Sequence, residues 1–239
     1  MSTTISVLSE EAAGISTVAA LMGHPTRAAI LAALVGGGAL PAGTLAQIAD
    51  VTASTASEHL ARLVEGGLLS VVSSGRHRYF RLRDASVAQA LEAVSAVGAS
   101  APARPRTAGP SPEMRLARSC YDHLAGSLGV GLTDALLRQG VLRPGERAFE
   151  LTAQGAARLS ALEIDVASAR MRKRLFSPTC LDWTERRFHL AGALGAAILQ
   201  RFMEARWVAR RADDRSLRIT VAGQRVLQRE FDLDLPPAP

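Results

Sequence analysis

The stretch "TASTASEHLARLVEGGLLSVVSSGRHRYFRL", from Thr52 to Leu82, combines a helical pattern with a strand pattern. At about 100° per residue, the apolar side chains of its first half fall on one narrow helical stripe. A helix that enters the DNA major groove reads base edges with its N-terminal residues, and its backbone N–H groups favour phosphate. An ordinary solvated face would also explain this helix taken alone. The side chains opposite the stripe and on its flanks are Ser54, Thr55, Ser57, Glu58, His59 and Arg62.

The second half of the stretch, "GLLSVVSSGRHRYFRL", predicts a strand, a Ser-Ser-Gly turn and a second strand. Arg76, His77 and Arg78 stand at the tip, and Phe80 and Leu82 return to the core. A basic hairpin directly after a candidate reading helix is typical of a winged helix. These three tip residues therefore join the six helix residues as candidate DNA contacts.

Three further helices are predicted before this stretch. Val18, Leu21 and Met22 have helical spacing, and Pro25 permits a second start because proline is tolerated in the first turn. The glycines at 36–38 end that second helix. Thr44 with Gln47 is a capping-box pattern for a third helix through Ala49, and Thr52 or Ser54 caps the fourth. Two short helices separated by a few residues predict a helix-turn-helix.

Composition fits a DNA-binding protein of two domains. The chain has 239 residues and a formal charge of +6, and Lys173 is its only lysine, so arginine carries nearly all the positive charge. Two cysteines and an N-terminus unlike a signal peptide favour a cytoplasmic protein. Apolar runs are too short to span a bilayer, so we expect no membrane insertion. The stretch "GASAPARPRTAGPSP" has linker composition, which divides the chain into residues 1–97, a linker at 98–112, and residues 113–239.

Three motifs, in order, resemble the DNA-binding domain of ArsR/SmtB-type bacterial transcriptional regulators: "LMGHPTRAAILAAL", "LAQIADVTASTASEHLARLVEGGLL" and "GRHRYFRL". The resemblance covers about residues 15–95. It implies a winged-helix homodimer, paired through its first and last domain helices, that binds a palindromic operator in double-stranded DNA. It further implies a repressor released by a small-molecule effector. The familiar metal ligands of that family are missing, because "GTLAQIAD" holds no cysteine and "DASVAQALEAV" offers only Asp84 and Glu92.

The C-terminal half repeats itself. "HLAGSLG" at His123 and "HLAGALG" at His189 share six of seven residues, and "FELTAQGAARL" from Phe149 pairs with "LRITVAGQRVL" from Leu217. Each unit predicts a helix, a strand pair and a helix, and the pairing predicts an internal duplication over about residues 115–170 and 180–235. The predicted fold class is therefore mainly α with small β-wings (α+β), an N-terminal winged helix-turn-helix followed by two winged-helix-like repeats.

A cysteine precedes each HLAG segment, and these neighbourhoods form the candidate effector site. If the repeats pack about a pseudo-twofold axis, the two neighbourhoods face one another. Three readings stay open: a planar organic anion held by aromatic and arginine side chains, metal or thiol-redox sensing through Cys120 and Cys180, and plain packing of the repeat interface. The candidate residues are Cys120, Tyr121, His123, Cys180, Asp182, Trp183, Arg186 and His189.

An enzyme is the competing class, since winged-helix segments also precede catalytic domains in some methyltransferases. The chain has no strand followed by G-x-G-x-x-G, and no P-loop, G-x-S-x-G or H-E-x-x-H pattern. We therefore expect no catalytic residues and no cofactor. A purely architectural DNA protein is the other rival, which sequence-independent binding would distinguish.

Overall fold

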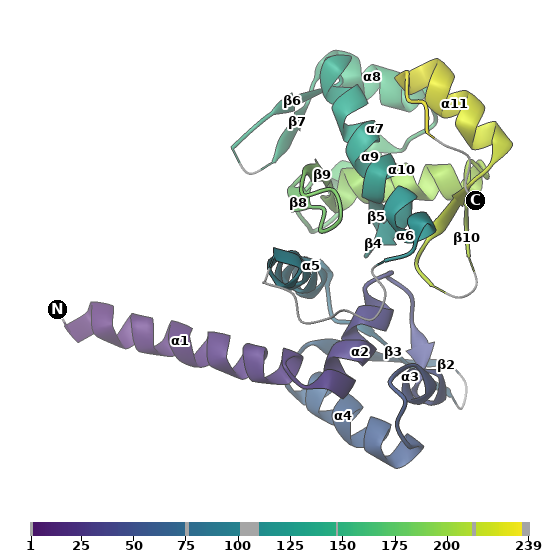
Figure 1. Ribbon diagram of the computed structural model, residues 1–239. Helices are drawn as coiled ribbons and strands as arrows, with labels where there is room; N and C mark the ends of the chain where they lie inside the picture. The colour runs from purple at the N-terminus through teal and green to yellow at the C-terminus, as the bar shows by residue number, and fades with distance from the viewer. Residues whose placement is uncertain (1, 75–76, 101–109, 147, 212–213, 236–239) are drawn as a thin grey trace. The chain divides into compact units, whose positions relative to one another are not determined.

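The computed structural model describes residues 2–74, 77–100, 110–146, 148–211 and 214–235 (Figure 1). The chain divides into two compact units, Met1–Ala88 and Gln89–Pro239, and each is described by itself. The predicted linker at 98–112 stays a prediction, because residues 101–109 lie outside the described ranges.

The first unit begins with two helices joined at His24. Helix α1 (Ser2–Met22) is followed by α2 (Pro25–Leu34), whose N-cap is His24 and whose first residue is Pro25, as the sequence predicts. Buried Arg27 donates from Nε to the carbonyl of Leu21 (2.6 Å) and from Nη2 to that of Ala20 (2.7 Å). It thereby satisfies two carbonyls that the end of α1 leaves without helical partners.

The helix-turn-helix consists of α3 (Ala42–Ile48) and α4 (Ala53–Glu65). Thr52 caps α4 by accepting from the Thr55 N–H, which confirms one of the two predicted caps. The capping box predicted for α3 is wrong, because the helix already begins at Ala42 and Thr44 lies inside it. Strand pairing of Leu40 and Pro41 fixes where this helix starts, and Pro41 is its N-cap without a side-chain bond.

A three-stranded antiparallel sheet completes this unit. Strands β1 (Leu40–Pro41), β2 (Leu69–Ser74) and β3 (His77–Leu82) pair in the order β1-β3-β2, which confirms the predicted hairpin. Phe80 and Leu82 are buried, as predicted. Asp84 then caps α5 (Ala85–Ser100) by accepting from the N–H groups of Ser86 and Val87. The core beneath the sheet comprises Ile30, Leu31, Leu34, Leu45, Ala56, Leu60 and Leu63. The fold of this unit is a winged helix-turn-helix.

The second unit shows one order of elements twice: a hairpin, a helix, a second hairpin and a further helix. The first set follows α6 (Pro112–Leu116) and runs β4 (Arg118–Cys120), β5 (His123–Ala125), α7 (Gly126–Arg138), β6 (Leu142–Pro144), β7 (Phe149–Leu151) and α8 (Ala153–Ala161). After α9 (Val166–Met171), the second set runs β8 (Thr179–Leu181), β9 (Phe188–Leu190), α10 (Gly192–Glu204), β10 (Val208–Arg210), β11 (Leu217–Ile219) and α11 (Val221–Phe231). The leading hairpins, β4–β5 and β8–β9, were not anticipated from the sequence.

The recurring T-x-x-G sequence has one structural cause in both sets. Thr152 caps α8 by accepting from the Gly155 N–H and donates its hydroxyl to the Gly140 carbonyl. Thr220 repeats both bonds with Gly223 and Arg206. The glycine is required because the residue before the second hairpin of each set passes against it: a Cβ on Gly223 would lie 2.0 Å from the carbonyl oxygen of Trp207, which precedes β10.

The two sets pack reciprocally around one core. Strand β5 of the first set contacts α10 of the second, and β9 of the second contacts α7 of the first. The strands β5 and β9 therefore lie against these two helices, and α8 and α11 lie toward the other end of this unit (Figure 1). Fully buried Leu128, Leu136, Leu194 and Phe202 line the shared interior.

Candidate functional site

The outer face of α4 carries most of the residues predicted to contact DNA. Ser54, Ser57, Glu58 and Arg62 are exposed, whereas Ala56, Leu60 and Leu63 face the core. Thr55 is half-buried, and its hydroxyl lies 3.0 Å from that of Thr52 within the helix cap. The Ser57 hydroxyl donates to the Ala53 carbonyl. The exposed face therefore presents two serines and Glu58 in the first half of α4 and Arg62 in its last turn.

His59 does not lie on the predicted DNA-contacting surface, because its side chain is buried. Its side chain is only 9 % exposed, and its ring packs against His24 with centroids 4.5 Å apart. Burial, followed by the nearby His24 and Arg27, lowers the pKa of His59. A residue on the flank of the apolar stripe is buried once α2 packs beside it, so His59 is removed from the candidate DNA contacts.

The hairpin β2–β3 extends from the same unit. Ser74 pairs with His77 next to its turn, and Arg78 is exposed with its guanidinium 5.6 Å from the Phe80 ring centroid. Arg81, three register steps further from the turn, donates to the hydroxyl of its cross-strand partner Ser70. Arg76 lies outside the described residues.

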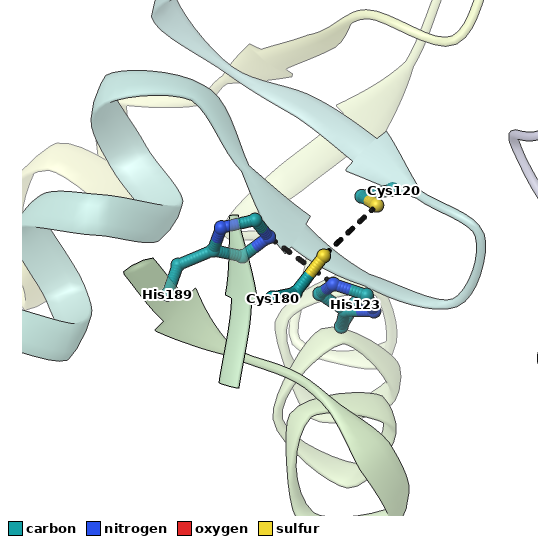
Figure 2. A group of neighbouring side chains, drawn as sticks. All are labelled: Cys120, His123, Cys180 and His189. Carbon is teal, nitrogen blue, oxygen red and sulfur yellow. Dashed lines mark hydrogen bonds between the residues drawn. The ribbon is translucent and has the colours of Figure 1, made fainter. Parts of the chain in front are cut away.

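The candidate effector residues of the second unit partly converge. Cys120 and His123 are cross-strand partners in β4–β5, and Cys180 and His189 are cross-strand partners in β8–β9. Figure 2 shows the four side chains meeting: the two Sγ atoms are 3.8 Å apart and the two Nε2 atoms 3.1 Å apart. All four are buried, and the hydrogen bond with Cys180, together with burial, raises the pKa of the Cys120 thiol.

Asp182 lies beside this cluster and is the counter-ion of Arg118. Its carboxylate accepts two bonds of 2.8 Å from the Arg118 guanidinium, and neither side chain is exposed to solvent. Backbone N–H groups of Gly126, Thr184 and Glu185 also donate to it. Burial alone would raise the pKa of Asp182, but the Arg118 charge and these bonds hold it well below its usual value.

The remaining predicted effector residues lie at the hairpin turns. Tyr121 and Arg186 have left-handed backbone conformations, with φ of 57° and 58°, and Arg186 is exposed. Trp183 is half-buried and lies against Arg118, whose guanidinium carbon is 5.1 Å from the ring centroid. A cavity between α7 and α10 has only about 10 Å³, which leaves room for no more than one water. That cavity is lined by apolar residues such as Leu132 and Ile198 and by none of the candidate effector residues, so binding of a planar organic anion by Trp183 and Arg186 stays a prediction.

Several residues around the cluster were missed by sequence reasoning. Arg118 is fully buried although nothing in its local pattern marks it. Gly129 and Gly195 end the two HLAG motifs, and a Cβ on Gly195 would lie 3.0 Å from the Cβ of His123 of the other set. The glycine at the seventh position of both HLAGSLG and HLAGALG is the sequence feature that could have indicated this close packing.

Within the described ranges, the structure has no single helix that is long and apolar enough to cross a membrane. The segments Ala12–Met22 and Pro25–Leu34 meet the length and composition requirement only together, and they are bent by 88° at their junction.

The chain is similar to known proteins both over a short N-terminal segment and over nearly its whole length. Residues 22–72 match a family described as a helix-turn-helix domain. Over 222 residues, the chain is 38 % identical to the uncharacterized HTH-type transcriptional regulator YdfF of Bacillus subtilis (strain 168), a match covering 92 % of this chain and 98 % of that protein.

Two solved structures illustrate the partial likenesses. NolR from Sinorhizobium fredii is 30 % identical, with a TM-score of 0.35, and the match covers 37 % of this chain and 87 % of that one. The homodimeric winged helix-turn-helix domain of Mb0332 from Mycobacterium bovis, a possible ArsR-family regulator, is 24 % identical with a TM-score of 0.35. That match covers 38 % of this chain and 82 % of the Mb0332 fragment.

Proposed function

The chain belongs to the HTH-type transcriptional regulators, and from this premise we propose that it is a homodimeric, operator-specific DNA-binding protein of the ArsR type. In this proposal α4 lies in the major groove and the hairpin β2–β3 contacts the adjacent backbone. The observation that carries it is the division of α4 into a buried apolar face and an exposed face bearing Ser54, Ser57, Glu58 and Arg62.

The exposed candidate residues of α4 would make different kinds of contact with DNA. Arg62 offers the planar donor fork that suits a guanine edge, and the serine hydroxyls suit several base edges. Glu58 would repel phosphate but can accept a bond from a cytosine amino group. On the hairpin, Arg78 is placed to contact phosphate, which positions the protein without reading sequence.

The proposed homodimer contact through α1 is supported by the exposed apolar residues of that helix. Ile15 is 70 % exposed and Val18 is 36 % exposed, and the neighbouring residues of the described helix are exposed as well. A two-fold pairing of α1 with its copy would bury this surface and would give an operator with two half-sites about one helical turn apart. We further propose repression as the mode of action, in the cytoplasm, with the second unit receiving the signal.

Selection of bound sequences from a random pool, followed by footprinting with the full chain, tests the proposal. We expect a palindrome, and an affinity that falls steeply as salt rises. Arg62→Ala should cost about 1–3 kcal/mol at one base position in each half-site, whereas Arg78→Ala should weaken all sequences alike and reduce the salt slope by about one per contact.

Arg143→Ala is the matched control, because it removes an exposed arginine from β6 of the second unit. It should leave both the preferred sequence and the salt slope nearly unchanged. The proposal is wrong if the selected pool contains no palindrome, or if Arg62→Ala and Arg78→Ala weaken every sequence equally.

A further inference from the structure

We propose that Cys120, His123, Cys180 and His189 bind one zinc ion, which joins the two leading hairpins of the second unit. The site lies wholly within Gln89–Pro239 and does not depend on how the first unit recognises DNA. It is formed by one Cys–His pair from each hairpin, so neither set of elements can complete it alone.

The distances between donor atoms fit a tetrahedral ion. With Zn–S near 2.3 Å and Zn–N near 2.05 Å, the edges of a regular tetrahedron are about 3.8 Å between sulfurs and about 3.3 Å between nitrogens. The observed separations are 3.8 Å for the two Sγ atoms and 3.1 Å for the two Nε2 atoms. No two of the four donor atoms are more than 4.8 Å apart, against an ideal sulfur–nitrogen edge of about 3.6 Å. A disulfide, by comparison, needs sulfurs about 2.05 Å apart.

Both imidazole rings are oriented as zinc ligands are. Each turns Nε2 toward the other three donors and Nδ1 toward a carboxylate: His123 Nδ1 is 3.7 Å from Asp122 Oδ1, and His189 Nδ1 is 4.0 Å from Asp182 Oδ2. Neither Nδ1 has a hydrogen-bond partner among the described residues. A carboxylate behind the histidine is the usual second layer of a zinc site, because it fixes the ring and its tautomer.

The tautomers of the two histidines distinguish the metal-bound site from a metal-free one. Without an ion, a bond between the Nε2 atoms makes one neutral ring the donor, and that ring then turns the lone pair of Nδ1 toward its carboxylate. With an ion on both Nε2 atoms, both rings carry their proton on Nδ1, where each faces an aspartate.

The charge also balances in this buried position. Cys120 and Cys180 are 2 % and 5 % exposed, and unpaired thiolates there would be strongly unfavourable. On binding, the two thiols release two protons to solvent, and the two thiolates neutralise the double charge of the ion. The hydrogen bonds of Asp122 to Arg174 and of Asp182 to Arg118 keep the carboxylates compensated independently.

Elemental analysis of the full chain, purified without a histidine tag, tests the proposal directly. We expect one zinc per chain, removal of that zinc by a strong chelator, and its return when zinc alone is added. Cobalt added to the metal-free protein should give the intense visible bands of a tetrahedral ion together with thiolate charge-transfer absorption. Both cysteines should react slowly with a thiol reagent until the chelator is present.

Variants locate the ion. Cys120→Ser and His189→Gln should each weaken zinc binding more than 100-fold. Asp122→Asn, which alters the carboxylate behind His123 and its ion pair with Arg174, should weaken it about 10–100-fold. His59→Gln is the matched control, because it replaces a buried histidine of the first unit and should leave zinc binding unchanged.

Three results would overturn the proposal. The first is a full chain that neither contains zinc nor takes up zinc or cobalt after reduction. The second is a cobalt spectrum without thiolate absorption. The third is a Cys120→Ser, Cys180→Ser variant that is folded by circular dichroism and still binds zinc as tightly as the unchanged chain. Because zinc and cobalt uptake are measured on the unchanged protein, they test the proposal even if a variant fails to fold.

Discussion

Replacement of Asp182 by asparagine should destabilise the second unit strongly, because it leaves a buried cation without its counter-ion. Arg118 and Asp182 are both fully buried and joined by two bonds of 2.8 Å. Asparagine keeps the oxygen that accepts from Thr184 and Glu185, but it turns an amide donor toward the Gly126 N–H and the guanidinium. Donors then face donors at the centre of the unit.

The magnitude follows from the cost of a buried charge without its partner. Breaking a buried ion pair on one side costs about 3–5 kcal/mol. For a unit the size of Gln89–Pro239, each kcal/mol lowers Tm by about 2–4 °C, so we expect a fall of roughly 6–20 °C. Urea unfolding and thermal unfolding, both followed by circular dichroism and tryptophan fluorescence, measure it, since Trp183 and Trp207 both belong to this unit.

The surface pair Arg187–Asp134 provides a matched control. It has the same chemistry and a bond of 2.8 Å, but Arg187 is 58 % exposed. Asp134→Asn should therefore change stability by less than about 1 kcal/mol. The double variant Arg118→Met, Asp182→Asn should be more stable than Asp182→Asn alone, because it also removes the uncompensated cation. Equal losses for Asp182→Asn and Asp134→Asn, or a double variant less stable than either single one, would refute the reasoning.

Three smaller perturbations test the local structure. Thr52→Ala removes the cap of α4 and should cost about 1 kcal/mol in urea unfolding of the first unit; no loss would mean that the hydroxyl does not cap the helix. Gly223→Ala places a Cβ 2.0 Å from the Trp207 carbonyl oxygen and should lower the free energy of unfolding by about 1–3 kcal/mol, whereas Gly43→Ala, with open space around its Cβ, should be neutral or stabilising. An equal change of Tm in the two variants would contradict the close approach at Gly223. Arg27→Met leaves two carbonyls at the end of α1 without donors, so it should lower the free energy of unfolding by about 2–3 kcal/mol and speed amide hydrogen exchange in that helix. Unchanged amide exchange in α1 would contradict this role of Arg27.

Most elements of the first unit could be predicted from local sequence patterns. The apolar stripe of α4, its cap at Thr52 and the hairpin with Phe80 and Leu82 turned inward are all local patterns. Their periods of 3.6 and 2 residues are properties of single elements, so they can be read along the chain without knowing what packs against them. The capping box at Thr44 failed for the complementary reason, because the pairing of Pro41 with Tyr79 decides where that helix begins.

Tertiary structure alone decided which side chains meet. Cys120 and His123 are three residues apart and Cys180 and His189 nine, so their spacings differ, yet each pair occupies the same cross-strand register in its hairpin. Loops of unequal length conceal that equivalence in the sequence. The ring of His59 packs against that of His24, and Arg118 pairs with Asp182, which is 64 residues further along the chain. Such contacts depend on how two elements pack against each other, and the pattern of neither element contains that information.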